Sequence, residues 1–540
     1  MLLVLSMMVF TACQDTPSFI PPTPETVEIV NFSGTTTLSI GEDIIELGAI
    51  VYPTGAKQQV TWSSDNPTIA TITDHGVVSG LAVGIATIRV NAIENTSIDA
   101  TFIVTVVDDT SDLLTISGII NTLNELIPDE INSDMALPTT LEGATITWAS
   151  SDYTTINRNG KVTRNRFDQE VELEATIKLS RSEGVFQKNI MVKAYPLKDI
   201  SNRKVAFTYL FNPNFTGFRE GDLDRIDVIN YSFGGINSNR VSINGLTNLT
   251  TIMEQAHAHG VRVVLAIGGW GVDGFSQACS TAESRTTFID SIMETIQKNR
   301  FDGIDIDWEY PTSTAGGLIA ASPYDKNNLT AFMQSLKVAM NEYDPSLILS
   351  MAVAAGTYAA SNYYNISALG SVIDYLHIMT YDMINYSTYT TTHHTNLYPS
   401  ANSTFSVSQA VETYFTQGMP KAKIVVGVAF YGHVFKTTSA GTNGINATSG
   451  KTGKTTARYQ YIVTNYLNNP LYTKYTDPVA MASWLYGEDT FISYDDPESI
   501  AKKCEYVLSE ELAGLMVWEY CQDDTNSSLL KAIYDNVIVK

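Results

Sequence analysis

The pattern of hydrophobic and polar residues changes character near residue 200. Between residues 27 and 107, apolar and polar residues alternate in short runs broken by Gly, Asn, Asp and Pro. Side chains of a strand point alternately to its two faces, so this pattern predicts a small all-β sandwich. A weaker form of the pattern covers residues 110–196, where ITWASSD at 146–152 mirrors VTWSSD at 60–65. We therefore predict a second, diverged sandwich after the first.

From residue 203 to residue 540, short apolar runs alternate with amphipathic stretches such as 249–259 and 286–298, which indicates repeated βα units. Candidate strands lie at residues 205–211, 226–233, 261–267, 303–307, 347–353, 375–380, 424–428 and 515–518. Eight such units predict a (β/α)₈ barrel, whose chemistry sits at the C-terminal ends of the strands. The Tyr-rich gap before the eighth strand predicts a small α+β insertion at about residues 433–495. The expected protein is therefore multidomain.

The N-terminus has the features of an export signal. Residues 1–12 are apolar but too short to span a bilayer, and they end in small residues before Cys13. This arrangement resembles a bacterial lipoprotein signal, residues 1–13, in which Cys13 becomes lipidated; an ordinary cleaved secretory signal is the alternative. Residues 14–26 are rich in Pro and Thr and predict an extended tether. We expect an extracellular protein anchored to the membrane through lipid on Cys13.

Composition narrows the range of functions. The chain has 57 acidic and 33 basic residues, and its net charge of −24 excludes nucleic-acid binding through a basic surface and disfavours an anionic substrate. Charged residues make up only 17% and Tyr contributes 28 residues, which suits neutral polar ligands. Four cysteines do not make a disulfide scaffold, although a bridge between Cys504 and Cys521 stays open.

The segment FDGIDIDWEYP at 301–311 carries the candidate chemistry. Strand alternation places Asp305, Asp307 and Glu309 on one face, which points into the barrel, and Trp308 on the other. Three carboxylates in a confined interior repel one another, and desolvation raises their pKa values. Glycosidic cleavage needs a carboxylic acid that stays protonated near neutral pH. Glu309, at the open end of the strand, is the candidate acid.

Two other interpretations of this acidic strand are weaker. A solvated acidic face does not fit the fourth strand of a barrel. A calcium loop requires Gly after the third ligand and Glu at position 12, where this chain has Tyr310 and Gly316. No His lies nearby in the sequence to complete another metal site. Asp302 opens the segment, and for it a structural role and contact with substrate both stay open.

The motif DGIDIDWEY at 302–310 resembles the catalytic signature of glycoside hydrolase family 18, which contains the chitinases and their relatives. One departure is Ala266, where that family usually has Ser, so a hydroxyl near the carboxylates is missing. In the first sandwich, residues 60–90 resemble bacterial immunoglobulin-like domains of group 2, with Trp62 expected in the core. Further resemblance to family 18 lies at 229–233, 266–270, 379–382, 427–433, 492–496 and 517–520.

The resemblance implies a substrate-assisted, retaining mechanism in which the substrate's own 2-acetamido group attacks the anomeric carbon. Glu309 would be the general acid and then the general base. Asp307 would orient the acetamido N–H and share a proton with Asp305. Tyr381 would hold the acetamido oxygen, and Asp382 would support the distorted sugar. Substrate contacts are expected from Trp518, Trp270, Tyr310, Tyr431, Tyr494 and Met379. No cofactor is implied and no metal is needed.

We therefore expect an endo-acting chitinase that hydrolyses β-1,4-linked N-acetylglucosamine polymers and works as a monomer. One alternative is an endo-β-N-acetylglucosaminidase that acts on N-glycans. Another is a surface protein that binds carbohydrate without hydrolysis, although the presence of Glu309 and Asp307 argues against it. The two sandwiches would serve either as spacers or as polysaccharide-binding modules.

Overall fold

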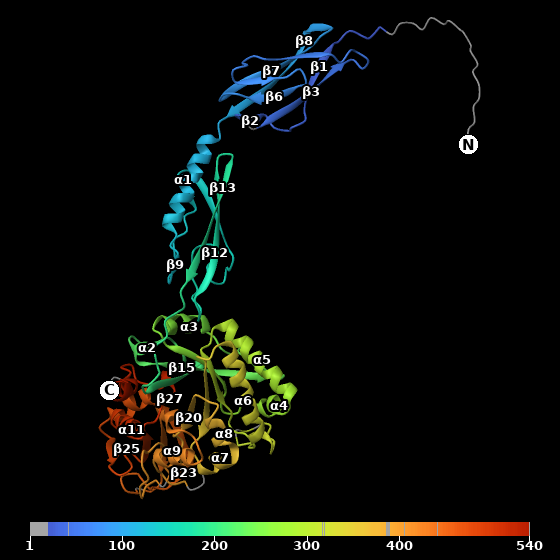
Figure 1. Ribbon diagram of the computed structural model, residues 1–540. Helices are drawn as coiled ribbons and strands as arrows, with labels where there is room; N and C mark the ends of the chain where they lie inside the picture. The colour runs from blue at the N-terminus through green and yellow to red at the C-terminus, as the bar shows by residue number, and fades with distance from the viewer. Residues whose placement is uncertain are drawn as a thin grey trace, which may run out of the picture. The chain divides into compact units, whose positions relative to one another are not determined.

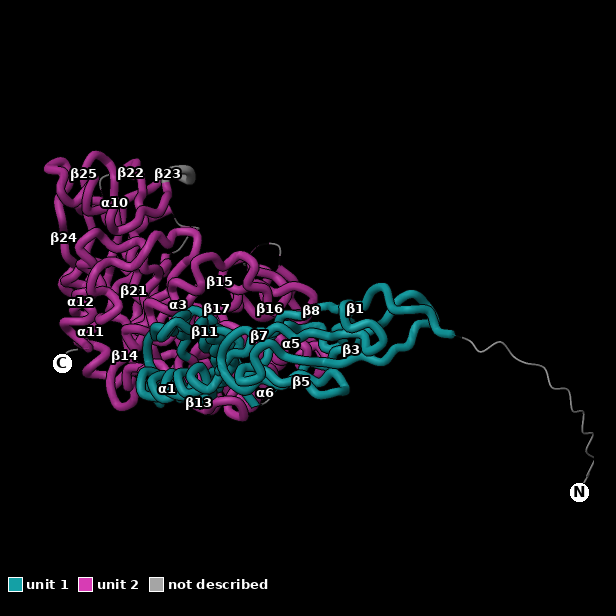
Figure 2. The backbone as a smooth tube through the Cα atoms, turned by 90° about the horizontal axis from the view of Figure 1, so that it is seen from above, with its two compact units in different colours: residues 1–164, 168–193 teal, residues 165–167, 194–540 magenta. Residues whose placement is uncertain are grey.

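The computed structural model describes residues 20–41, 43–315, 317, 319–384, 389–403, 405–439 and 441–538 (Figure 1). The chain divides into two compact units, residues 1–164 with 168–193 and residues 165–167 with 194–540 (Figure 2). The expected signal sequence and Cys13 lie outside the described residues. Across the described ranges, no helix has the length and apolar character needed to cross a membrane.

The first module is a β-sandwich, as the alternating pattern predicts. Its core contains Leu38, Ile45, Ile88 and Val104, and Trp62 packs against it while staying partly exposed. Within the described residues, one sheet has the order β1 (Thr26–Asn31), β3 (Ile44–Tyr52), β6 (Val77–Gly80) and β5 (Ala70–Ile72). The other has the order β2 (Thr37–Ser39), β8 (Asn95–Val107), β7 (Gly84–Ala92) and β4 (Val60–Ser64).

The second module contains a helix that the sequence pattern did not lead us to expect. Helix α1 (Thr110–Leu126) buries Ile116, Ile119 and Leu123 against the sheet, beside strand β13 in Figure 1. Gly184 on β13 allows this close approach, since a Cβ there would lie 2.4 Å from Ile116. The sheet order is β10 (Thr140–Leu141), β11 (Ala144–Ser150), β12 (Gln169–Leu179), β13 (Ser182–Val192) and β9 (Glu130–Ile131).

The C-terminal unit is a closed parallel barrel, which confirms the predicted fold class. Strand β14 pairs with both β15 and β27, so the sheet has no open edge among its described barrel strands. The barrel strands are β14 (Val205–Phe211), β15 (Val228–Asn237), β17 (Arg262–Gly268), β18 (Gly303–Asp307), β19 (Ile348–Ala354), β20 (Tyr375–Met379), β21 (Ile424–Ala429) and β27 (Gly514–Trp518). Strand β16 (Arg240–Ser242) extends β15 as a hairpin.

Helices between the barrel strands bury their apolar stripes against the outside of the sheet. In α6, for example, Leu329, Phe332, Leu336 and Met340 are buried at helical spacing. The helices are α2 (Asp222–Arg225), α3 (Leu249–Ala258), α4 (Phe275–Cys279), α5 (Ala282–Asn299), α6 (Asp325–Tyr343), α7 (Thr357–Tyr363), α8 (Ile366–Gly370), α9 (Val407–Thr416), α11 (Pro497–Ser509) and α12 (Ser528–Ile533).

The predicted insertion between the seventh and eighth barrel strands is an antiparallel sheet with one short helix, α10 (Tyr459–Ile462). Its apolar centre is Phe435, Trp484 and Phe491. The sheet order is β23 (Ser449–Arg458), β22 (Tyr431–Thr437), β26 (Thr490–Tyr494), β25 (Ala482–Gly487) and β24 (Thr473–Asp477). In Figure 2 this sheet stands at one end of the C-terminal unit.

A buried ion pair between Asp495, which follows the last strand of the insertion, and Lys503 connects the insertion to the barrel. The ammonium of Lys503 on α11 is fully buried and contacts both carboxylate oxygens of Asp495 at 2.6 and 2.8 Å. It also donates to the hydroxyl of Thr395 at 2.6 Å. Asp495 in turn accepts from the backbone N–H of Ala429, at the end of β21. Neither charge can be solvated if the other is removed.

We therefore expect Lys503→Met to destabilise the C-terminal unit by about 3–5 kcal/mol, because it leaves the Asp495 carboxylate buried without its cation. Thermal unfolding of the full chain at pH 7, followed at the transition of the C-terminal unit, measures the loss. Lys502→Met is the matched control: Lys502 is the exposed neighbour on the same helix, and its pair with Glu505 should change stability by less than about 1 kcal/mol. Equal effects of the two substitutions would contradict the prediction.

Candidate active site

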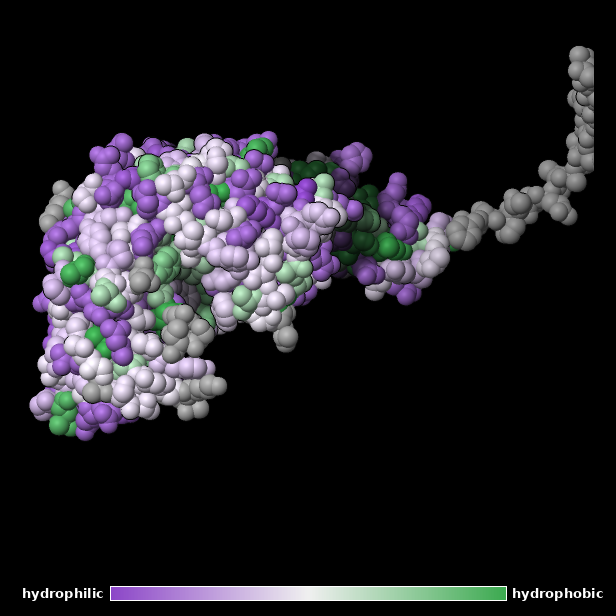
Figure 3. Space-filling model, turned by 90° about the horizontal axis from the view of Figure 1, so that it is seen from below, coloured by the Kyte–Doolittle hydropathy of each residue, from purple (hydrophilic) through white to green (hydrophobic). Residues whose placement is uncertain are grey.

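The C-terminal ends of the barrel strands surround a cavity of about 1090 Å³. The space-filling view in Figure 3 shows a hollow in this unit with hydrophobic residues along its wall. Apart from Asp305 and Tyr494, all the predicted site residues line the cavity: Asp307, Glu309, Trp270, Tyr310, Met379, Tyr381, Asp382, Tyr431 and Trp518. The structure therefore brings together residues that lie almost 250 positions apart in the sequence.

Three acidic residues, Asp305 and Asp307 on β18 and Glu309 in the following loop, form a row from the barrel interior to the cavity. We call this row the carboxylate ladder. Asp305 is fully buried, Asp307 is 4% exposed and Glu309 is half-buried. Burial, then the charges of Glu309 and Asp305, raise the pKa of Asp307 well above its ordinary value. Burial raises the pKa of Glu309 to about 7 and that of Asp305 to about 6. A carboxyl group at Glu309 therefore keeps its proton near neutral pH.

Neutral hydroxyl groups hold the innermost carboxylate. Tyr209 donates to Oδ2 of Asp305 at 2.6 Å, and Ser350 donates to Oδ1 at 2.7 Å. Burial lowers the pKa of the neighbouring His377 to about 3, so this ring stays uncharged beside Asp305. Because the ring is neutral, it does not pull the pKa of Asp305 down as a cation would.

Ser350 on β19 supplies a hydroxyl to Asp305 in place of the one that is missing at Ala266 on β17. Ala266 and Ser350 flank Asp305 on neighbouring strands β17 and β19, in register with it. The sequence showed the lost hydroxyl but not its replacement, because the register of β19 against β18 is a property of the barrel. Ser350 is thus a site residue that the sequence analysis missed.

Asp382 follows β20, two strands along the barrel from β18, and lies in a different electrostatic environment. Asp382 accepts a hydrogen bond from the hydroxyl of Tyr431 at 2.7 Å and contacts Nε2 of His433 at 2.5 Å. Burial alone would raise the pKa of Asp382, but the hydrogen bond and charge of His433 outweigh it and lower the pKa to about 2. Asp382 is therefore an anion near neutral pH, whereas Glu309 still holds its proton in part of the molecules.

Aromatic rings form the floor and one rim of the cavity. Trp518 stacks on Phe233 with ring centroids 5.7 Å apart and also contacts Tyr209. Trp270 is 64% exposed and meets Tyr310 edge to face. An exposed indole at a cavity rim is available for packing against an apolar ligand face. Trp308 points away from the acids and stacks on Phe275, as strand alternation predicts.

Tyr494 does not reach the cavity, which corrects the expectation that it contacts substrate. Its side chain is 1% exposed and stacks on Tyr459 of α10 inside the insertion. All five residues of β26 are buried, so alternation along that strand gave no indication of which side chains face the cavity.

The loop after β17 needs its two glycines to approach the acidic strand. Gly268 has φ of 116°, and a Cβ there would lie 2.0 Å from the carbonyl oxygen of Asp307. A Cβ on Gly269, with φ of 90°, would lie 2.8 Å from the ring of Phe233. These contacts explain why glycine precedes the exposed Trp270.

Asp302 lies at the other end of β18 and holds the base of the barrel. It accepts from the Tyr195 hydroxyl at 3.0 Å, from the Val263 N–H at 2.7 Å, and contacts His257 at 2.7 Å. It also pairs with the guanidinium of Arg166. The structure therefore gives Asp302 a structural role, far from the cavity.

Comparison with known proteins agrees with the geometry. Residues 203–523 match the model of glycosyl hydrolases family 18. Residues 27–102 match the bacterial Ig-like domain of group 2, and residues 122–195 match the atrophied bacterial Ig domain. Because the first match spans more than half of the chain, the protein belongs to glycosyl hydrolase family 18.

Among curated relatives, chitinase A1 of Niallia circulans is 31% identical over 307 residues, covering 52% of this chain and 43% of that protein. Probable chitinase 2 of Drosophila melanogaster is 30% identical, covering 51% and 58%. The chain thus spans about half the length of these two relatives. Among solved structures, a family 18 N-acetylglucosaminidase from Paenibacillus barengoltzii has a TM-score of 0.58 at 33% identity, covering 62% of this chain and 100% of that one.

The raised pKa of Glu309 predicts a pH-dependent cost to stability. The unfolded chain loses this proton near the ordinary value of 4.5 and the folded chain near 7, so the folded state binds more protons between these values. Stability contributed by the neutral carboxyl is present at pH 4 and is lost as the pH rises through 7. Glu309→Gln should therefore raise the midpoint of thermal unfolding, relative to the parent, by a few degrees more at pH 8 than at pH 4.

Glu342→Gln, on the exposed surface of α6, controls for the loss of one negative charge and should show no such difference between the two pH values. If Glu309→Gln and the parent keep the same offset at both pH values, the carboxyl does not titrate as described.

Proposed function

We propose that the protein is an endo-acting chitinase that hydrolyses β-1,4-linked N-acetylglucosamine polymers. The observation that carries this proposal is Glu309, whose pKa near 7 leaves a protonated carboxyl at the edge of a cavity beside the buried Asp307. A proton donor in that state can protonate a glycosidic oxygen at neutral pH. The names of the curated relatives support the same substrate class.

The chain's own residues fit a substrate-assisted mechanism. Glu309 gives its proton to the glycosidic oxygen while the C1–O bond breaks and the substrate's acetamido oxygen bonds to C1. Asp307 accepts the acetamido N–H; within the described residues its Oδ1 has no hydrogen-bond partner and is available for this contact. Water then attacks C1, Glu309 takes its proton, and the ring formed with the acetamido group reopens.

The remaining cavity residues position the sugar. The Tyr381 hydroxyl, whose contact with the Met516 sulfur is long at 3.9 Å, can donate to the acetamido oxygen. Trp518 and Met379 both line the cavity and offer apolar surface to the sugar. Asp382 and Tyr431 also line the cavity and offer polar contacts to the sugar's hydroxyl groups. Trp270 and Tyr310 at the rim suit further sugar units of a linear polymer.

We also propose that the protein works outside the cell, held to the membrane by lipid on Cys13 and by the tether of residues 14–26. The two immunoglobulin-like modules, proposed at residues 27–107 and 110–196, then act as spacers or as weak polysaccharide-binding units. These features rest on the N-terminal sequence and on the matches to bacterial Ig-like domains.

Glu309→Gln in the full chain should lower the release of chitobiose from chitin and from N-acetylglucosamine oligomers by at least about 10²-fold, because it removes the proton donor. In the parent, kcat should fall as the pH rises through about 7, where Glu309 loses its proton. Glu283→Gln, exposed at the start of α5, is the control and should behave as the parent does.

The products distinguish the alternatives. Binding of chitin by the parent without any cleavage would reject the enzyme and favour a carbohydrate-binding protein. Cleavage of the chitobiose core of N-glycans without cleavage of chitin would favour an endo-β-N-acetylglucosaminidase instead.

Ser350 should act as a positioning residue for the carboxylates. Ser350→Ala removes one of the two hydroxyl donors to Asp305, which should destabilise the catalytic unit by about 1–3 kcal/mol and lower kcat with little effect on KM. Adding Ala266→Ser returns a hydroxyl from the other flanking strand and should recover part of both losses. A single variant with parental kcat and stability would show that Ser350 has no such role.

A further inference from the structure

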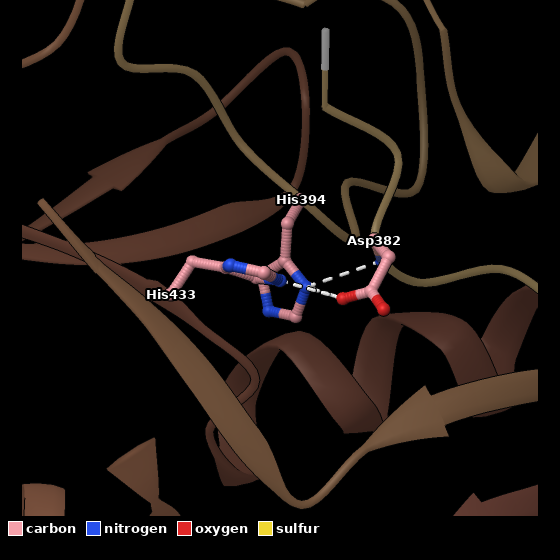
Figure 4. A group of neighbouring side chains, drawn as sticks. All are labelled: Asp382, His394 and His433. Atoms are coloured by element: carbon pink, nitrogen blue, oxygen red, sulfur yellow. Dashed lines mark hydrogen bonds and ion pairs between the residues drawn. The ribbon is translucent and has the colours of Figure 1, made fainter. Parts of the chain in front are cut away.

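Three potential metal ligands lie together in the wall of the cavity, and the proposed mechanism uses only one of them. Asp382 follows β20, His394 lies in the segment after it, and His433 is on β22 of the insertion (Figure 4). Nε2 of His433 is 2.5 Å, and Nδ1 of His394 is 3.9 Å, from Oδ1 of Asp382. One ligand atom from each residue lies within 4.8 Å of the others.

The hydrogen bonds show which ring nitrogens carry lone pairs. Nδ1 of His394 accepts from the backbone N–H of Asp382 at 3.4 Å, so it is the unprotonated nitrogen of that ring. Nε2 of His433 faces a carboxylate oxygen, to which it donates its proton, and the other tautomer of the ring places a lone pair on Nε2. Both rings are buried, and their centroids are 4.8 Å apart at an angle of 66°. In Figure 4 both nitrogens and the carboxylate point toward one another.

We propose that Asp382, His394 and His433 form a binding site for a divalent transition metal ion, with Zn²⁺ as its representative. Two imidazoles and one carboxylate suit Zn²⁺, Co²⁺, Ni²⁺ or Cu²⁺ and not the all-oxygen preferences of Mg²⁺ and Ca²⁺. The two histidines are buried, whereas the side chain of Asp382 is 47% exposed, so water from the cavity can complete the coordination.

Only small movements are needed to admit the ion. Tetrahedral Zn²⁺ with ligands at about 2.0–2.1 Å separates its ligand atoms by roughly 3.3 Å. The 2.5 Å contact must lengthen and the 3.9 Å distance must shorten, which requires the Asp382 carboxylate to rotate. The two histidine nitrogens, which lie within 4.8 Å of each other, must also come closer through small rotations of their rings. The proton on Nε2 of His433 moves to Nδ1 of the same ring, so that the neutral imidazole offers the lone pair of Nε2 to the ion.

The groups around the two histidines and Asp382 limit the affinity of the site for a metal ion. A metal-ligating histidine ordinarily donates its other ring N–H to an acceptor, and losing such a partner costs roughly 10–100-fold in affinity. Nε2 of His394 and Nδ1 of His433 have no hydrogen-bond partner in the parts of the chain that the structure describes. The ammonium of Lys454 is also close enough to interact with Asp382. We therefore expect micromolar rather than nanomolar binding.

Metal binding would inhibit the enzyme. This consequence rests on the proposed function, since it requires Asp382 to contact the sugar. An ion held by Asp382 and filled out by water would occupy the space of the substrate and withdraw the carboxylate from it. Binding of the ion and of an N-acetylglucosamine oligomer should then exclude each other.

The test begins with Zn²⁺ and the metal-free full chain, without substrate, so that its outcome does not depend on the proposed activity. Isothermal titration calorimetry should show one Zn²⁺ per chain with Kd in the micromolar range. Absence of saturable binding at millimolar Zn²⁺ would overturn the proposal.

His394→Asn and His433→Gln keep a polar atom near the position of each ligating nitrogen and should each weaken Zn²⁺ binding at least tenfold. His259→Asn is the matched control, because His259 belongs to an exposed His–Asp pair with Asp224 outside the cavity. Circular dichroism verifies that each variant is folded. If both cavity variants bind Zn²⁺ as tightly as the parent, the ion lies elsewhere and the proposal is wrong.

A second readout concerns the cavity. In Glu309→Gln, which keeps the metal ligands, a hexamer of N-acetylglucosamine should raise the apparent Kd of Zn²⁺, and a chelator should restore activity to the Zn²⁺-treated parent. Zn²⁺ binding that is lost in both histidine variants but indifferent to the hexamer would overturn the inhibitory role and leave the metal site itself supported.

Discussion

The carboxylate ladder of Asp305, Asp307 and Glu309 is the constraint on which the catalytic unit depends. Burying even one charge costs several kcal/mol, so three neighbouring carboxyl groups persist only when most of them are protonated or strongly hydrogen-bonded. The barrel meets this requirement by closing on all sides, which keeps water from the inner positions. The loop glycines before Trp270 allow the neighbouring strand to close over Asp307.

Glu309 and Asp382 line the same cavity, but their pKa values are shifted in opposite directions. The hydrogen bonds from Tyr209 and Ser350 lower the pKa of Asp305, but burial outweighs them and raises it. A nearby arginine or protonated histidine would lower the pKa values of these carboxyl groups further. Next to β20, His433 lowers the pKa of Asp382 and keeps it ionised. One acid and one fixed anion thus share a cavity because their neighbours differ.

The sequence pattern predicted the features that depend on a single strand. It did not predict contacts between segments that are distant in the sequence. Strand alternation placed Asp305, Asp307 and Glu309 on one face, and the βα count yielded the eight barrel strands. Helix α1 was missed because Ile116, Ile119 and Leu123 were read as part of a β-rich module. Ser350 depends on the register between strands, and His394 on the course of a long loop. Tyr494 was assigned to the site by resemblance, although its fully buried strand turns it into the insertion.

The insertion supplies the side chains that set the charge of Asp382. Tyr431 and His433 both come from β22, the first strand of the insertion, so the ionised state of Asp382 is set by an element outside the barrel. The same placement puts a second histidine ring, His394, against the first. A carboxylate fixed by imidazole nitrogens has the donor set of a transition-metal site. The imidazole contact that keeps Asp382 charged therefore also places a nitrogen ligand beside a carboxylate, as a transition-metal site requires.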